Sequence, residues 1–260
     1  MELLVLGLVL LARNLVTGRP ECPQDHTTIK EVPLDMAPNS FDDQYEGCSR
    51  AMEDELEELN HTEFANNSVY ARTWTLATKE WQKRQNLIPQ TLRSEQAIAL
   101  LAYTLHCPLY KEFNAAVCQA WRSREEYLNH FNYKSLHFLL SETLWALMDT
   151  PQHCHQVFQG VRGTRFITQP GKLVRFGEFT STTLWKEEAL SYGQDTFFSV
   201  KTCRGVPIRD LSFNRSKEEI LIPPFEIFQV TSIKQRRSTV FIELNHKAAN
   251  SNCNCEFVNG

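Results

Sequence analysis

Two adjacent glutamates, Glu218 and Glu219, stand where a loop meets a short apolar run in the C-terminal third of the chain. The run, residues 220–222, is Ile-Leu-Ile and ends at two prolines, which cannot donate the backbone hydrogen bonds of a sheet. A short apolar run with such an end is typical of a buried strand. Because a carboxylate at the entrance of a buried strand can be held rigidly beside a cavity, these glutamates are the first candidates for chemistry.

The eight cysteines offer a second kind of chemistry, either disulfides or a metal site. An even number of cysteines favours disulfides in an oxidising compartment. Cys253 and Cys255 form a Cys-x-Cys pair rather than the Cys-x-x-Cys knuckle of zinc sites, and the sequence contains no second knuckle. Cys154 lies between His153 and His155, which is a denser cluster. We favour disulfides and predict no metal.

The elements that position these residues divide the chain in two. Between residue 35 and about residue 150, apolar residues recur at spacings of three and four, which predicts helices packed into a core. Ser94 is placed to cap one helix, and Ser123 with Glu126 matches a capping box. The acidic run 53–58 is most simply the solvated face of the first helix. The expected helices are 45–59, 70–84, 94–105, 113–121, 123–126 and 133–148.

After Pro151 the pattern changes to strands. One strand opens at 157–158 and is followed by a turn at 160–163, and the others cover 173–179, 196–203, 220–222, 225–233 and 239–244. A short helix over 186–192 is expected to end at Gly193. Helices followed by strands predict an α+β fold. We expect a single domain over residues 19–260, with a helical part at about 35–150 and a sheet part at about 155–257.

Composition describes an ordinary globular protein, with 42% hydrophobic and 22% charged residues. The formal net charge of −4 gives no basic footprint for nucleic acid, so we exclude that class of partner. We expect a monomer.

The N-terminus predicts export. Residues 3–12 are an apolar run of ten, which is too short to span a bilayer and suits a signal peptide, predicted over residues 1–18. The alternative is a buried N-terminal helix. Asn60, Asn66 and Asn214 each begin an Asn-x-Ser/Thr glycosylation sequon. Residues 252–260 are polar and lack the hydrophobic tail of a lipid anchor. We therefore expect a secreted, extracellular, soluble glycoprotein without a membrane anchor.

Several segments resemble a known family. They are Asp-Met-Ala-Pro-Asn-Ser-Phe-Asp-Asp-Gln-Tyr-Glu-Gly-Cys at 35–48, Cys-His-Gln-Val-Phe-Gln-Gly-Val-Arg-Gly at 154–163, Val-Arg-Phe-Gly-Glu-Phe-Thr-Ser-Thr-Thr at 174–183, Glu-Ile-Leu-Ile-Pro-Pro-Phe-Glu at 219–226 and Asn-Cys-Glu-Phe at 254–257. They are similar to vertebrate ecto-mono-ADP-ribosyltransferases of the arginine-specific type, and the match runs from about residue 31 to residue 257.

The resemblance implies a split β-sheet with an NAD cleft between its halves, preceded by a helical part. It implies NAD as co-substrate, with NADP as a possible substitute, and arginine-bearing proteins as acceptors. It also implies two disulfides, Cys48 with Cys255 and Cys154 with Cys203. A local bridge between Cys107 and Cys118 is plausible, and the pairing of Cys22 and Cys253 stays open.

The family chemistry moves the ADP-ribosyl group of NAD to an arginine side chain and releases nicotinamide. Breaking this glycosidic bond passes through a transition state that resembles an oxocarbenium ion, as in glycoside hydrolysis. A carboxylate helps by facing the developing positive charge. The family uses an arginine, a serine and a Glu-x-Glu pair. By position, the resemblance assigns the serine to Ser181 and the second glutamate, which serves the ribose, to Glu219.

Two positions depart from the family pattern. The arginine slot, which follows Phe158 and precedes Gly160, holds Gln159. A neutral amide in place of a charged fork on a phosphate loses about 1.5 kcal/mol, which weakens NAD binding roughly tenfold. Arg162, three residues away, is a candidate to compensate.

The first glutamate of the pair is replaced by Lys217. A cation about 4 Å from an incoming guanidinium costs roughly 4 kcal/mol at an effective dielectric near 20. Glu218 could take over this role if the loop is bulged by one residue, because regular strand geometry points it away from the face of Glu219. On that regular geometry Lys217 shares the face of Glu219 and could form an ion pair with it.

Three functions fit this sequence. An active transferase would use Glu219 and Ser181 with help from Glu218 or Arg162, and would bind NAD with Gln159, Gly160, Arg162, Ser181 and Glu219. A weakened enzyme would hydrolyse NAD or modify a different acceptor. As a catalytically inactive relative, the protein would act only as a binding protein. We take the first as the prediction, an NAD–protein-arginine ADP-ribosyltransferase.

Overall fold

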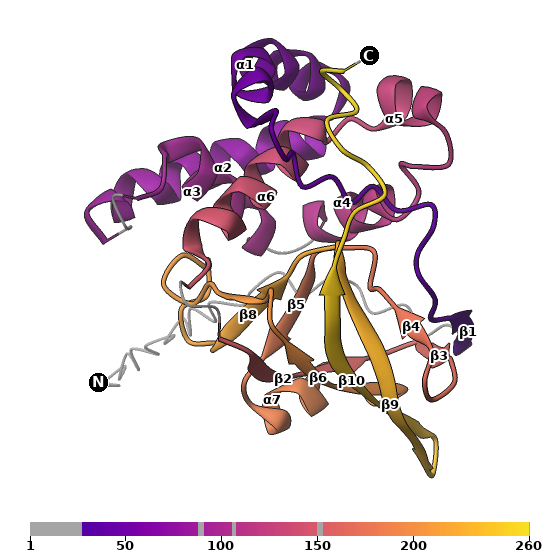
Figure 1. The fold of residues 1–260 in the computed structure, drawn as a ribbon. Helices are drawn as coiled ribbons and strands as arrows, with labels where there is room; N and C mark the ends of the chain where they lie inside the picture. The colour runs from indigo at the N-terminus through magenta and orange to yellow at the C-terminus, as the bar shows by residue number, and fades with distance from the viewer. Residues whose placement is uncertain (1–27, 88–90, 106–107, 150–152, 260) are drawn as a thin grey trace, which may run out of the picture.

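The structure is a computed structural model that describes residues 28–87, 91–105, 108–149 and 153–259. Helices come first and strands afterwards, which confirms the α+β prediction. Figure 1 shows helices α1 to α6 together above the strands, with α7 below them. The helices are α1 (Ser49–Asn66), α2 (Ser68–Arg84), α3 (Ser94–Thr104), α4 (Leu109–Val117), α5 (Arg124–His130), α6 (Lys134–Leu147) and α7 (Lys186–Tyr192), with a 3₁₀ turn η1 (Gln85–Leu87) after α2.

Several helix boundaries differ from the sequence prediction for local reasons. The first helix begins at Ser49 rather than at residue 45, because Tyr45 has a φ of +58° and is not helical. Ser94 is the first residue of α3 and not its cap, since the cap is Arg93, whose backbone N–H donates to Gln96 Oε1 at 2.9 Å. Ser123 does cap α5, where its hydroxyl accepts from the backbone N–H of Glu126 at 3.0 Å.

Eight strands form the main sheet in the order β4-β9-β10-β6-β2-β5-β8-β7. Its strands are β2 (His155–Val161), β4 (Leu173–Val174), β5 (Thr180–Thr183), β6 (Thr196–Thr202), β7 (Val206–Pro207), β8 (Glu219–Ile222), β9 (Glu226–Arg236) and β10 (Thr239–Ala249). A separate parallel pair joins β1 (Lys30–Pro33) to β3 (Thr164–Ile167).

The sheet is split between β2 and β5. Seven residues of β2 pair with β6, whereas β2 meets β5 only where Phe158 lies opposite Thr183. The strands therefore diverge beyond this point and leave the side chains of β2, β5 and β8 facing an opening. This is the split sheet that the resemblance implied.

The prediction of a strand over 173–179 is correct only for its first two residues. β4 ends at Val174, and the next side chain, Arg175, turns inward and is only 3% exposed. Gly177 has a φ of +71°, a left-handed conformation that favours glycine, and β5 begins three residues later. The apolar alternation of this segment thus belongs to a buried bend and not to a continuous strand.

The apolar core forms two clusters. One fills the helical half and extends to strand and loop residues that include Phe179, Ile208 and Leu221. The other lies within the sheet and includes Val157, Phe198 and Ile242. Because the first cluster contains residues of the helices together with Leu221 of β8, the helices pack directly on the strands that carry the candidate site.

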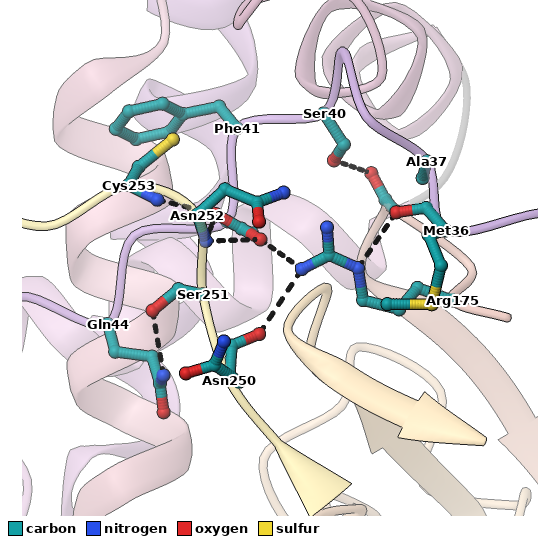
Figure 2. Close-up of polar contacts among 12 residues, drawn as sticks. Met36, Ala37, Ser40, Phe41, Gln44, Arg175, Asn250, Ser251, Asn252 and Cys253 are labelled. Carbon is teal, nitrogen blue, oxygen red and sulfur yellow. Dashed lines mark hydrogen bonds and ion pairs between the residues drawn. The ribbon is translucent and has the colours of Figure 1, made fainter. Parts of the chain in front are cut away.

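Segments near the two ends of the described chain meet at a buried ion pair (Figure 2). Arg175 Nη1 contacts Asp42 Oδ2, and both side chains are almost fully buried. Asp42 also accepts from the backbone N–H groups of Asn252 and Cys253 at 2.9 and 3.1 Å, while Arg175 donates to the carbonyl of Met36 at 2.9 Å. This cluster, Asp42 with Arg175 and the segment 250–253, is called the Asp42 clamp.

Both disulfides that the resemblance implied are present, Cys48–Cys255 and Cys154–Cys203. Cys154 is therefore not available as a metal ligand. Cys118 and Cys253 carry free thiols, so the bridge expected between Cys107 and Cys118 is wrong. The signal peptide predicted at 1–18, together with Cys22 and Cys107, lies outside the described residues. Within the ranges that the structure covers, we find no helix long and apolar enough to cross a membrane.

Candidate active site

Glu219 begins β8 and is held by two serine hydroxyls. Ser181 Oγ donates to its Oε1, and Ser212 Oγ donates to its Oε2 at 2.9 Å. The residue is only 8% exposed. Since each carboxylate oxygen accepts a hydrogen bond from a different segment, the carboxylate has a fixed orientation. Ser212 has no counterpart in the sequence prediction, because it lies in a loop with no periodic pattern and reaches Glu219 only through the fold.

Ser181 is positioned by the pairing of β5 with β8. It lies opposite Leu221, and Thr183 lies opposite Glu219. The neighbouring Thr182 turns to the other side, where its hydroxyl donates to the carbonyl of Ile220 at 2.7 Å. The alternation of β5 thus places Ser181 and Thr183 on the face of Glu219.

An open cleft lies at the split of the sheet. Of the predicted site residues it brings together Gln159 from β2, Ser181 from β5 and Glu219 from β8, and Lys217 lines it as well. The nine lining residues are Phe158, Gln159, Ser181, Thr182, Thr183, Glu188, Tyr192, Lys217 and Glu219. Gly160, Arg162 and Glu218, also predicted as site residues, are not among them.

Gly160 allows α7 to approach β2. A Cβ at this position would lie 2.1 Å from the backbone oxygen of Ala189 and 2.4 Å from that of Gly193. Only glycine fits so close to another backbone. Arg162, which follows in the same strand region, is exposed, and its guanidinium donates to the carbonyl of Ser191 at 3.5 Å. Both residues therefore hold α7 in place beside the cleft.

Glu218 points away from Glu219. Its carboxylate pairs with Arg209, with 2.6 Å between Nη1 and Oε1, and its side chain is 31% exposed. The backbone carbonyl of Glu218 accepts from Leu184 N–H at 3.1 Å, which fixes the entrance of β8. The β5–β8 pairing is regular from Glu219 to Ile222, and Glu218 lies in the loop just before it.

Lys217 lies against an aromatic ring at the cleft wall. Its ammonium is 4.3 Å from the ring centroid of Tyr192 and donates to the Tyr192 hydroxyl. That hydroxyl donates in turn to Glu188 Oε1 at 3.1 Å, and Thr183 Oγ1 donates to Glu188 Oε2 at 2.8 Å. Sequence reasoning missed Glu188 and Tyr192; the helix 186–192 was predicted, but not the face that it turns to the cleft.

Burial also raises pKa values in and around the segment that leads into β5. It raises the pKa of the Glu178 carboxyl to about 7. The thiol of Cys118 is 3.5 Å from the carbonyl of Gly177 and 3.8 Å from Glu178 Oε2. Burial raises the pKa of this thiol to about 12, so the sulfur stays protonated at neutral pH.

The three sequons differ in their surroundings. Asn60 and Asn66 lie on α1, and Asn66 is exposed. Asn214 is different, because its Nδ2 is buried and has no hydrogen-bond partner among the described residues. Its Oδ1 accepts from the hydroxyl of Ser216 at 2.8 Å. The atom that would carry a glycan at Asn214 is thus turned inward in the folded chain.

The chain is similar to known ADP-ribosyltransferases over nearly its full length. It is 52% identical over 257 residues to the erythroblast NAD(P)⁺–arginine ADP-ribosyltransferase of Gallus gallus, covering 98% of this chain and 85% of that protein. It is 45% identical over 275 residues to the GPI-linked NAD(P)⁺–arginine ADP-ribosyltransferase 1 of Homo sapiens, covering 99% and 84%.

A solved structure has the same fold. It is a mutant of the eukaryotic mono-ADP-ribosyltransferase ART2.2 in complex with NAD, which is 34% identical and has a TM-score of 0.77. The similarity covers 87% of this chain and 99% of that one. Residues 34–252 match the family described as NAD:arginine ADP-ribosyltransferase. The chain belongs to the NAD:arginine ADP-ribosyltransferase family.

Proposed function

We propose that this protein transfers ADP-ribose from NAD to arginine side chains of proteins and releases nicotinamide. One observation carries the proposal: a buried carboxylate, Glu219, is fixed by Ser181 and Ser212 and lines a cleft at the split of the sheet. The relatives named for this reaction, and one that binds NAD in a solved structure, support it.

In this reaction the bond between ribose and nicotinamide breaks, and its electron pair leaves with nicotinamide. A guanidinium nitrogen of the acceptor then bonds to the ribose and loses a proton. Positive charge develops on the ribose between these events, and a preorganised carboxylate stabilises it most. Glu219 suits this task because its two serine partners fix its direction before the reaction.

Gln159 would contact the dinucleotide as a neutral donor. It lies on β2 at the cleft, in the slot where the family has arginine. A neutral hydrogen bond to a phosphate is about half as strong as a charged one, so NAD binds more weakly than with arginine. NADP is a second dinucleotide candidate, since the relatives are named for NAD(P)⁺. The two disulfides support a secreted, extracellular protein.

A second candidate function is NAD hydrolysis, in which water replaces the guanidinium as acceptor. The cation Lys217 on the cleft wall favours it, because a cation disfavours a positively charged acceptor and does not disfavour water. Glu219 and Ser181 serve the ribose equally in both reactions.

Labelled NAD and agmatine, a small guanidine, test the proposal with the purified protein and its Glu219→Gln variant. The proposal predicts label on agmatine with the unchanged protein and at least about a hundredfold less with the variant. Nicotinamide release without label transfer would favour hydrolysis. No turnover, with no protection by NAD against thermal unfolding, would contradict both.

A further inference from the structure

Two carboxylates, and not one, face the cleft. Glu188 of α7 and Glu219 of β8 are the acidic residues among its lining residues. Thr183 joins them: it lies directly opposite Glu219 in the β5–β8 pairing, and its hydroxyl donates to Glu188 Oε2 at 2.8 Å. Opposite residues of an antiparallel pair have Cβ atoms about 4.5–5.5 Å apart, so both carboxylates flank one threonine.

Glu188 keeps room for a further hydrogen-bond donor on each oxygen. Oε1 accepts from Tyr192 and Oε2 from Thr183. An ionised carboxylate has about four lone-pair sites, so each oxygen has one left. A guanidinium presents its N–H groups as a planar fork that matches two carboxylate oxygens. The side chain is therefore oriented by protein contacts and still able to bind an arginine side chain.

The cation near Glu188 is held by the aromatic residue Tyr192. Lys217 lies over the ring of Tyr192, where the cation–π contact and the phenol oxygen stabilise its charge. The Tyr192 hydroxyl thus lies between the ammonium and Glu188 Oε1, to which it donates at 3.1 Å. Glu218, the other acidic neighbour of Glu219, is paired with Arg209 outside the lining of the cleft.

The backbone fixes this arrangement. Gly160 and Gly193 bring α7 into close contact with β2, since a Cβ at either position would lie within 2.4 Å of a backbone atom. Glu188 and Tyr192 are four residues apart on α7, so they share one face of the helix. That face is turned to the cleft.

We propose that Glu188 binds the guanidinium of the arginine acceptor, in place of the glutamate that Lys217 replaces. This inference rests on the proposed function, because it names the residue that selects the acceptor in the same cleft. Glu188 determines the specificity for the acceptor, whereas Glu219 serves the ribose.

Glu188→Gln tests this against Glu187→Gln, a matched change at the preceding, exposed residue of α7. We measure the Kd of agmatine by NMR titration of the protein saturated with carba-NAD, an analogue that is not cleaved. We then measure how NAD partitions between agmatine and water. Glu188→Gln is expected to raise the agmatine Kd about tenfold and to lower the ratio of transfer to hydrolysis about tenfold, while Glu187→Gln stays within about twofold.

An agmatine Kd within about twofold of the unchanged protein in Glu188→Gln would overturn the inference. So would a parallel loss of transfer, hydrolysis and carba-NAD affinity, because a merely structural role would loosen the whole cleft. If agmatine binding depends on Glu188 but the protein does not cleave NAD, the inference is supported and the proposed function is contradicted. The two failures are thus distinguishable.

Discussion

At the scale of single residues, the site combines features that a sequence shows with contacts that it does not show. Ser181, Gln159 and Glu219 lie in motifs that resemble the family, and the structure brings all three to one cleft. Ser212, Glu188 and Tyr192 have no such motif. They were missed because their contacts, Ser212 with Glu219, Tyr192 with Lys217 and Glu188 with Thr183, arise from the fold and leave no local spacing in the sequence.

Gln159 is the residue whose replacement should strengthen NAD binding. We expect Gln159→Arg to lower the KM for NAD about tenfold, because a charged fork replaces a neutral donor at a phosphate. Steady-state nicotinamide release over a series of NAD concentrations measures it. Gln156→Arg, an exposed position on the same strand, is the matched control and should leave the KM unchanged. An unchanged KM in Gln159→Arg would remove this residue from the dinucleotide site.

At the scale of elements, the predicted and observed boundaries agree where the local pattern decides them. The helix over 186–192 ends at Gly193 as expected, and the strand expected at 220–222 is β8. The prediction of a strand over 173–179 is wrong beyond Val174. The chain bends there because Arg175 forms an ion pair with Asp42, which is far away in the sequence. Likewise, no local signal marks Tyr45 as non-helical.

The packing of α7 on β2 gives a prediction for Gly160. We expect Gly160→Ala to lower the free energy of unfolding by about 1–3 kcal/mol, since the new Cβ meets the backbone of Ala189 and a backbone atom cannot rotate away. Transfer to agmatine should fall with it, because α7 carries Glu188. Urea unfolding monitored by fluorescence is the measurement.

Gln156→Ala on the same strand is the control for this change, because its side chain is exposed. A stability for Gly160→Ala within about 0.5 kcal/mol of the unchanged protein would show that α7 does not depend on this contact.

At the scale of the whole molecule, the helical half and the sheet are held together by the Asp42 clamp and the Cys48–Cys255 disulfide. Figure 1 shows the C-terminal segment running from β10 back across the helices to α1. The disulfide closes a loop across 207 residues of sequence. The resemblance implied this disulfide, but the ion pair of Asp42 with Arg175 had no signal, because nothing in a sequence marks which buried charges will meet.

We expect the loss of one charge in the Asp42 clamp to lower the stability of the fold strongly. Arg175→Met should lower the free energy of unfolding by about 3–5 kcal/mol, since it leaves Asp42 buried without its cation. Denaturant titration under oxidising conditions measures it. Arg215→Met breaks an exposed pair with Asp210 and should cost less than about 1 kcal/mol. Equal effects of the two changes would contradict this description of the clamp.

One pair of measurements separates the chemistry at Glu219 from the binding of NAD. Nicotinamide release at saturating NAD gives kcat, and titration with carba-NAD gives the Kd, for the unchanged protein, Glu219→Gln and the control Glu187→Gln. We predict that kcat falls at least about a hundredfold in Glu219→Gln while the Kd changes less than about threefold. A Glu219→Gln variant that retains more than about a tenth of kcat would show that Glu219 does not carry the chemical step.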